Sequence, residues 1–361
     1  MPFRDIAGHR LTLRLLARAA ARRSLPPANR RLGGSDRLAA GGRGVGKRRT
    51  AVALAQALNC LELRTDVVLE GVSGSKGTTL ALDACGLCAA CRRIARGMHP
   101  DVMTLAPDPE AGNIKVEVVR ELIDRIGYRP FEGRWRVVII DDADTLLDSA
   151  QNALLKTLEE PPSTSVFVLV TAQPDALLAT VRSRCPQVRF APLAAAEIAA
   201  HLQVAHGMAV PEAHATAAAA DGSIGTALEA GTEAVTVIRD GARRLLEQVA
   251  RARGVRGRFA AAQMIVGKTP KGYGAGERES VATHLRVLQT MLRDIGVLST
   301  SADGCALANA DLTDVLEGLR PAFDHARLVH AFTAVHHAID ALGPPRNGSP
   351  KIVADWVALQ V

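Results

Sequence analysis

The chain has 361 residues, of which 48% are hydrophobic and 3% aromatic, and its formal net charge is +7. This length is enough for two or three domains, and the hydrophobic fraction excludes a wholly disordered chain. No apolar run reaches the roughly 18–20 residues of a membrane-spanning helix, and the Arg-rich start lacks the compact apolar stretch of a signal peptide. We therefore expect a cytoplasmic protein without membrane contact. Its basic surface is either diffuse or suited to nucleic acid or an acidic protein.

The first segment contains a helix and then a glycine-rich loop. Apolar and basic residues alternate at helical spacing over 11–23, and residues 26–36 have the composition of a loop. The stretch AGGRGVGKRRTAVALAQAL at 40–58 predicts a phosphate-binding loop followed by a helix with one buried face. The residues before it, SDRLAAGG, lack the β-branched run of a central strand.

The glycine loop matches the pattern G-x-x-x-x-G-K through Gly41, Gly46 and Lys47, with a further glycine at Gly44. Glycines let backbone N–H groups point at phosphate oxygens, and the lysine adds a positive charge. The next position normally carries a Ser or Thr hydroxyl that helps to hold Mg²⁺. Here it is Arg48, and a guanidinium has only donors. A phosphate site with impaired magnesium binding is one interpretation, and a glycine-rich turn without function is the other.

Metal ligands are predicted where cysteines cluster after the loop helix, over about 58–97. The cluster consists of Cys60, Cys85, Cys88 and Cys91. Two-residue spacings between cysteines are typical of a structural Zn²⁺ site, because a tight turn can present several sulfurs to one ion. The alternative is an iron–sulfur cluster, whose pattern needs another cysteine near Ala95. Two isolated cysteines, Cys185 and Cys305, are expected to be buried apolar residues.

The middle of the chain alternates helices and strands. We expect an irregular surface loop over 64–82, then helices in AACRRIARGM and KVEVVRELIDRIGYRP. Buried strands are predicted in WRVVIIDDAD and SVFVLVTA, with a shorter one in VRSRCPQVRFAPL. The helix SAQNALLKTLEE lies between the first two strands and ends at a Pro-Pro pair. This order predicts a three-layer α/β domain over 1–190.

Two sites in this domain carry charges that suggest chemistry. Asp141 ends a strand in the manner of a Walker B acid, and Asp142 stands where many ATPases carry a catalytic Glu. Because Asp is one methylene shorter, its carboxylate would place the attacking water poorly. A capping role at the strand end is the alternative. Arg184, in the sequence SRC, is either a surface residue or a trans-acting finger toward a neighbour's phosphate.

The β pattern ends near residue 192. Three short helices follow in AAAEIAAHLQVAH, PEAHATAAAADG and IGTALEAG, and longer amphipathic segments occupy 235–253, 277–299 and 322–342. We therefore expect a small helical domain over 191–233 and an all-helical domain over 234–361.

Several stretches resemble bacterial clamp-loader AAA+ subunits in both sequence and order. They are FRDIAGH, the glycine loop, the four-cysteine module, HPDV, VVIIDDAD, NALLKTLEEPP, TVRSRC and GSIGTAL, and they cover about residues 3–230. The resemblance implies an AAA+ P-loop domain with a zinc module, a helical lid and a helical collar for oligomerisation. The 24 residues between Cys60 and Cys85 are a longer insertion than is usual in the family.

Within that family, the departures resemble the delta-prime class more than the gamma/tau motor class. Arg48 replaces the metal-binding hydroxyl and Asp142 the catalytic Glu. The sensor-2 arginine is absent at Gly225 and Thr226, and the sensor-1 position falls at Ala172 or the adjacent Thr171.

The resemblance implies a heteropentameric loader of DNA polymerase III that places a sliding clamp on primed DNA. The partners would be gamma/tau and delta subunits, the clamp, and primed DNA within the assembled complex. The chain itself would hydrolyse little or no ATP, bind ATP/Mg²⁺ doubtfully, carry structural Zn²⁺, and offer Arg184 to a neighbouring ATPase subunit. A catalytically active gamma/tau-type ATPase is the second choice. A stand-alone nucleic-acid-binding protein is a further competitor.

Overall fold

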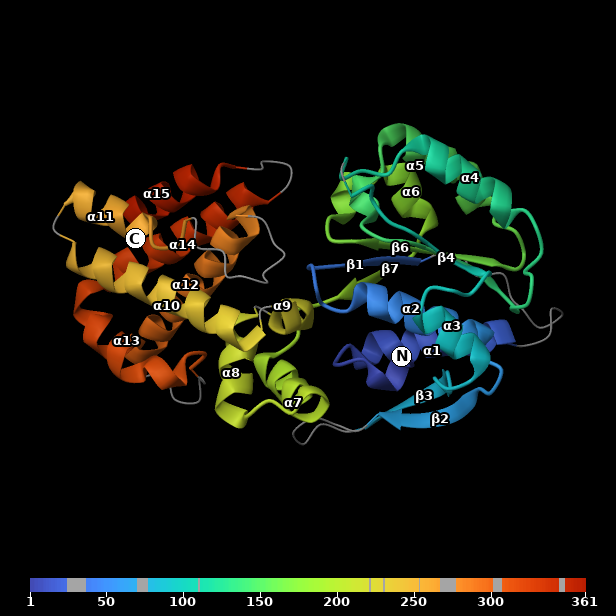
Figure 1. The fold of residues 1–361 in the computed structure, drawn as a ribbon, viewed down its shortest axis with the longest axis horizontal. Coiled ribbons are helices and arrows are strands. Elements are labelled where there is room, and N and C mark those ends of the chain that lie inside the picture. Colours follow the sequence, from blue (N-terminus) through green and yellow to red (C-terminus); the bar gives the residue numbers. More distant parts are fainter. Residues whose placement is uncertain are drawn as a thin grey trace. The chain divides into compact units, whose positions relative to one another are not determined.

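The computed structural model describes residues 1–24, 37–69, 77–109, 111–220, 222–229, 231–252, 254–266, 277–300, 307–343 and 348–361. The loop expected at 26–36 and Cys305 lie outside these residues. The chain divides into two compact units, Met1–Leu193 and Ala194–Val361 (Figure 1).

The first unit is built on a five-stranded parallel sheet with the strand order β4-β5-β6-β1-β7. The strands are β1 (Arg37–Gly41), β4 (Val102–Leu105), β5 (Arg136–Ile140), β6 (Ser165–Thr171) and β7 (Gln187–Phe190). Every residue of β5 and β6 is buried, as expected for strands covered on both faces. The carboxyl ends of β1, β5 and β6 lie at one edge of the sheet, where the candidate site is found.

Alternate side chains of β5 face two different helical layers. Val137 and Ile139 share a core with α1 (Arg10–Ser24) and α2 (Lys47–Asn59). On the opposite face, the neighbouring positions of β5 share a core with α4 (Val116–Ile126), α5 (Asp148–Glu159) and α6 (Ala179–Arg184). Figure 1 shows the sheet between these layers, with α3 (Ala89–Ala95) beside α2. The predicted α/β architecture with a parallel sheet is confirmed.

The expectation of an irregular loop over 64–82 was wrong. This segment contains two antiparallel strands, β2 (Arg64–Leu69) and β3 (Thr78–Asp83). Leu80 and Leu82 of β3 are buried in the core that contains α1. Burial of these two leucines stabilises a hairpin that the many Gly, Ser and Thr residues of the segment conceal.

Two strands of the main sheet had no clear sequence signal. β1, which lacks a β-branched run, pairs with β6 on one side and β7 on the other. Its small residues Ala39 and Ala40 are buried between the helical layers, so the neighbouring elements supply the apolar contacts that the strand itself lacks. β4 at the sheet edge was not predicted at all.

The second unit is helical throughout its described residues. Its helices are α7 (Ala195–His206), α8 (Val210–Ala219), α9 (Ile224–Glu229), α10 (Gly231–Arg251), α11 (Val255–Ala262), α12 (Glu277–Thr300), α13 (Thr313–Leu319), α14 (His325–Leu342) and α15 (Pro350–Gln360). A single core joins α10 to α15 through residues such as Leu245, Leu288 and Val357. Division of this unit into a lid at 191–233 and a collar at 234–361 stays a prediction. Within the described residues, no helix combines the length and the apolarity that membrane crossing requires.

Candidate functional site

The glycine loop connects β1 to α2 and has the backbone conformation that its sequence predicts. Gly44 and Gly46 have φ angles of 69° and 96°, in the left-handed region where other residues are strained. At Gly41, a Cβ atom would lie 2.2 Å from the carbonyl oxygen of Phe190 in β7, so no larger residue fits. The loop thereby delivers the chain into the N-terminus of α2, whose first N–H groups have no partner within the helix.

Lys47 lies inside this loop. Its Nζ donates to the carbonyl oxygens of Gly41 at 2.6 Å and Gly42 at 2.5 Å, and the residue is only 7% exposed. Burial lowers the pKa of Lys47, while the nearby carboxylates of Asp142 and Asp144 oppose that shift. The two hydrogen bonds hold the Lys47 ammonium group against the carbonyl oxygens of the loop.

Arg48 forms an ion pair with Asp141 across the edge of the sheet. The Arg48 Nε lies 3.3 Å from the Asp141 Oδ2, and the Arg48 side chain is largely exposed whereas that of Asp141 is largely buried. Burial raises the pKa of Asp141 above its ordinary value, although the nearby Arg48 guanidinium opposes that shift. The next hydroxyl along α2, that of Thr50, donates to the Gly46 carbonyl oxygen at 2.9 Å.

These contacts test whether the residues present fit a bound Mg²⁺. The carboxylate that would help to hold the ion is paired with a guanidinium, and the helix offers the ion no hydroxyl because Thr50 bonds backwards to the loop. A guanidinium cannot replace either ligand, since it carries only donors. The residues do not fit a magnesium ion.

Two further acids follow β5. Asp142 adopts the left-handed conformation with φ of 43°, and its N–H donates to Asp141 Oδ1 at 3.2 Å. Asp144, which the sequence did not single out, accepts from the Thr171 hydroxyl at 2.6 Å and from the Ala172 N–H at 3.1 Å. The hydroxyl nearest the expected sensor-1 position is therefore bonded to a carboxylate. The repeated acids of DDAD were the available signal for Asp144.

Arg184 ends α6 and makes its described contacts with α5 and α6 rather than with the glycine loop. Its guanidinium forms an ion pair with Glu159 at the end of α5 and donates to the Thr180 carbonyl oxygen at 2.7 Å. The side chain remains 30% exposed. The Glu159 pairing was not visible in the sequence, because the two residues lie on different helices.

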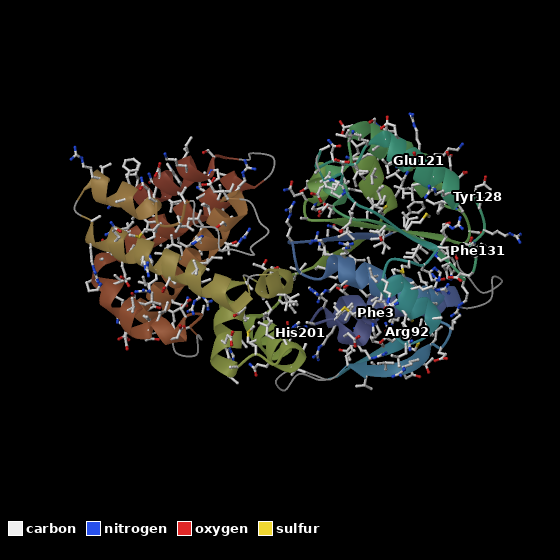
Figure 2. All side chains as sticks on the ribbon, viewed as in Figure 1. Phe3, Arg92, Glu121, Tyr128, Phe131 and His201 are labelled. Carbon is white, nitrogen blue, oxygen red and sulfur yellow. The ribbon has the colours of Figure 1, made fainter. Side chains whose placement is uncertain are left out.

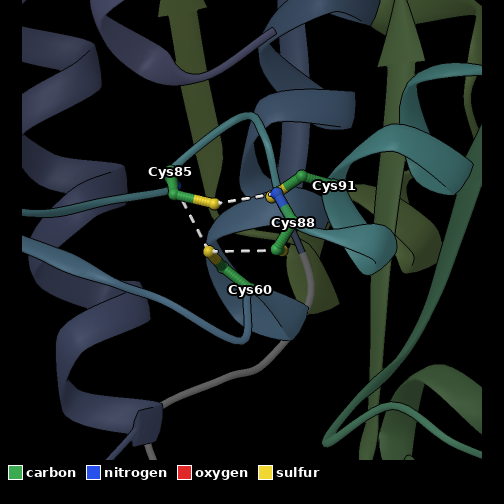
Figure 3. A group of neighbouring side chains, drawn as sticks. All are labelled: Cys60, Cys85, Cys88 and Cys91. Atoms are coloured by element: carbon green, nitrogen blue, oxygen red, sulfur yellow. Dashed lines mark hydrogen bonds between the residues drawn. The ribbon is translucent and has the colours of Figure 1, made fainter.

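The four clustered cysteines come together in space (Figure 3). Their sulfur atoms all lie within 4.8 Å of one another, and the Cys60 and Cys88 sulfurs are 4.0 Å apart. Sulfurs bound to one Zn²⁺ at about 2.3 Å lie about 3.8 Å apart in a tetrahedron. The N–H groups of Cys85 and Cys88 each donate to a cluster sulfur at 3.2 Å, as suits thiolates. The four residues fit a tetrahedral metal such as zinc, whose role there would be structural.

The thiols differ in their acidity. Burial raises the pKa of Cys60 and Cys91. Burial also acts to raise the pKa of Cys88, but hydrogen bonds from Cys91 and Leu61 outweigh it and lower the value to about 6. Among Cys60, Cys88 and Cys91, Cys88 is therefore the thiol that ionises most readily.

Contacts that the sequence did not reveal hold this module in place. The Arg4 guanidinium donates to the Cys85 carbonyl oxygen at 2.7 Å, and Asp83 accepts from the Phe3 N–H at 2.8 Å. Gln56 of α2 donates to the Cys91 carbonyl oxygen at 2.7 Å. Hydrogen bonds from the N-terminal segment and from α2 thus hold the cysteine cluster in place.

A buried ion pair between Arg136 and Asp101 holds the loop between α4 and β5. The Asp101 carboxylate accepts from the N–H groups of residues 131–133 at 2.7–2.9 Å and from Arg136 at 3.1 Å. This fixed loop carries two exposed aromatic residues, Tyr128 and Phe131, which lie beyond the end of α4 (Figure 2). Sequence reasoning did not identify Asp101 or the aromatic pair.

Comparisons with known proteins match part of this chain to subunits of bacterial DNA polymerase III. Residues 34–194 match the sequence profile of the family described as DNA polymerase III, delta subunit. The delta' subunit of Escherichia coli K12 is 45% identical over 109 residues, which are 30% of this chain and 33% of that protein. The tau subunit of the same strain is 35% identical over 206 residues, 55% of this chain and 29% of that protein.

Among solved structures, a DNA polymerase III gamma subunit-related protein from Thermotoga maritima is 17% identical, with 97% of this chain and 98% of that chain covered and a TM-score of 0.36. The chain spans about a third of the length of the curated relatives it matches. The sequence matches are therefore to the delta' and gamma/tau subunits of bacterial DNA polymerase III, and the family profile covers residues 34–194 of this chain.

Proposed function

We propose that the chain is a delta-prime-type clamp-loader subunit that hydrolyses little or no ATP. It would assemble with gamma/tau and delta subunits, in the cytoplasm, and help to place a sliding clamp on primed DNA. Its own contribution would be structural support, a zinc-stabilised module, and one arginine that acts on a neighbour's nucleotide.

The observation that carries this proposal is the ion pair between Arg48 and Asp141. It occupies a carboxylate that a working ATPase needs for its metal. Water activation is weakened as well, because Asp142 is shorter than the usual glutamate. Loss of one positioned group commonly costs about 10²–10³-fold in rate, so two losses leave hydrolysis close to background.

Arg184 supports the second half of the proposal. Its guanidinium lies at the end of α6, its side chain is 30% exposed, and its described partners are Glu159 and the Thr180 carbonyl oxygen. Such a group can turn toward a phosphate carried by an adjacent subunit without disturbing the core. A guanidinium supplied in this way stabilises the charge that develops in phosphoryl transfer.

The test is reconstitution with gamma/tau and delta subunits. We expect a stable complex with DNA-stimulated ATPase activity that falls at least about tenfold with Arg184→Ala, since arginine fingers contribute far more than that. Arg182→Ala is the matched control, because Arg182 is exposed on the same helix and pairs with Asp175. Failure to assemble, or equal activity of the two variants, would refute the proposal.

The second candidate is a gamma/tau-type ATPase. It is favoured by the longer match to tau and by the presence of both Lys47 and Asp141. ATP turnover by the purified chain separates the two, because a working ATPase should turn over at about 1 s⁻¹ or faster.

A further inference from the structure

The glycine loop is rich in positive charge. Arg43, Lys47, Arg48 and Arg49 lie within seven residues, and all but Lys47 are exposed. An ordinary P-loop site neutralises its nucleotide with a divalent cation bound to a hydroxyl and acids. In this chain the hydroxyl is absent, and Arg48 instead bonds to the acid. A guanidinium therefore contacts the acid that an ordinary P-loop site uses for its metal ion.

We propose that this loop binds the polyphosphate of a metal-free nucleoside di- or triphosphate, with Arg48 in place of Mg²⁺. This inference rests on the proposed function only in taking the site as non-hydrolytic.

The contacts of Lys47 and of Arg48 both support this proposal. Lys47 is already inside the loop and is satisfied by two backbone carbonyl oxygens, from which its ammonium group can turn to a phosphate. The Arg48 guanidinium contacts Asp141 through Nε, so its two terminal nitrogens are available to a phosphate while that contact persists. Paired hydrogen bonds from guanidinium to phosphate are among the stronger ones in proteins.

Magnesium should act as a competitor in such a site. A Mg²⁺-nucleotide would bring a second cation toward Asp141. Because that carboxylate is already paired with Arg48, the Mg²⁺ ion would find no free ligand there and would repel the Arg48 guanidinium. The metal-free nucleotide has more negative charge to meet the ammonium group of Lys47 and the guanidinium of Arg48. Binding is thus expected to be stronger with EDTA than with excess Mg²⁺, the reverse of an ordinary P-loop protein.

The experiment is titration of the purified full chain with a fluorescent ADP, in EDTA and in Mg²⁺. We expect saturable binding in EDTA that weakens severalfold in Mg²⁺. Arg48→Ala should weaken binding in EDTA by roughly tenfold or more, the effect of one or two charge-assisted hydrogen bonds. Arg48→Ser, which restores the hydroxyl, should bind better with Mg²⁺ than without it.

Arg49→Ala is the matched control, because it removes one exposed charge from the same turn without touching the ion pair. Circular dichroism of each variant verifies its folding. Absence of binding in EDTA, binding that requires Mg²⁺, or equal losses in the Arg48 and Arg49 variants would each overturn the inference. None of these outcomes bears on assembly with gamma/tau, which the reconstitution measures separately.

Discussion

At the scale of single residues, the Glu159–Arg184 ion pair determines how readily the Arg184 side chain, the proposed finger, can turn toward a neighbouring subunit. Both side chains are partly exposed, at 48% and 30%, so the pair contributes under about 1 kcal/mol to folding stability. A guanidinium held so weakly can exchange a carboxylate for a phosphate. The pair would therefore hold the finger until a neighbour's nucleotide is presented.

Glu159→Gln tests that holding role. We expect an unfolding free energy within about 0.5 kcal/mol of the unmodified chain, and a two- to threefold rise in ATPase activity of the reconstituted complex at limiting subunit concentration, where release of Arg184 matters most. Asp175→Asn, which breaks the Arg182 pair, should change neither quantity. Activity that falls in the Glu159 variant would mean that the glutamate positions the finger instead.

Asp101 is the opposite case, a carboxylate without solvent exposure. It accepts hydrogen bonds from three backbone N–H groups and from Arg136. Removal of the carboxylate leaves the Arg136 charge buried without its partner, so Asp101→Ala should lower the unfolding free energy by about 3–5 kcal/mol. Urea denaturation measures this loss. Asp175→Ala, which removes an exposed carboxylate, should cost no more than about 0.5 kcal/mol, and equal losses would contradict the assignment.

The same carboxylate predicts a pH dependence. Burial acts to raise the pKa of Asp101, but the backbone and Arg136 hydrogen bonds outweigh it and lower the pKa below the ordinary value. A lowered folded pKa means that the stabilisation is present above the unfolded value, about 3.9, and is lost as the pH falls through the folded value. The stability difference between the unmodified chain and Asp101→Asn should therefore shrink between pH 7 and pH 3. A difference that stays constant would show that ionisation of Asp101 is irrelevant.

At the scale of elements, the strands differ in how clearly their own sequences predicted them. β5 and β6 were predictable because VVII and VFVLV are continuous apolar runs, buried at every position. β1 was obscured by Ala39 and Ala40, whose strand conformation is imposed by pairing with β6 and β7. The β2–β3 hairpin was missed because Leu80 and Leu82 are buried by α1, a partner distant in sequence.

The candidate sites divide in the same way. Short-range patterns predicted the glycine loop and the grouping of Cys85, Cys88 and Cys91, since spacing within a turn fixes which atoms can meet, whereas Cys60 is brought to them across 24 intervening residues. Pairings between elements were not predictable: Arg48 with Asp141, and Arg184 with Glu159, depend on how α2, α5 and α6 pack on the sheet. The sequence indicated that Arg48 could not bind a metal, but not that it pairs with the acid that would.

The cysteine module is an element whose fold should depend on its metal. Purified chain should contain about one Zn²⁺, and Cys91→Ser should lose it and melt at a lower temperature, because zinc binding contributes folding energy directly. A strong chelator should bring the unmodified chain to the same melting temperature. Cys185→Ala is the control: it lies in the other core, so its zinc content should not change. Iron with visible absorbance, or unaltered zinc in Cys91→Ser, would contradict the assignment.

At the scale of the whole molecule, the chain contains separate cores in its two units. The first unit has one apolar core on each face of its sheet, and the second has a core of its own among α10 to α15. A unit with its own core is able to fold alone. Catalytic and metal-binding candidates all lie in the first unit, whereas the second carries none that the sequence or the described structure identifies.

This separation predicts that assembly and chemistry can be divided between two fragments. Residues 1–193 and 194–361, expressed separately, should each unfold cooperatively, because each retains a complete apolar core. If the helical unit is the oligomerisation domain, 194–361 should co-purify with gamma/tau and compete with the full chain, while 1–193 should retain zinc but assemble at least about tenfold more weakly. Arg184→Ala in the full chain, which leaves the helical unit intact, should co-purify normally. Assembly by 1–193 alone would place the principal contacts on the α/β unit and remove the collar role from the helices.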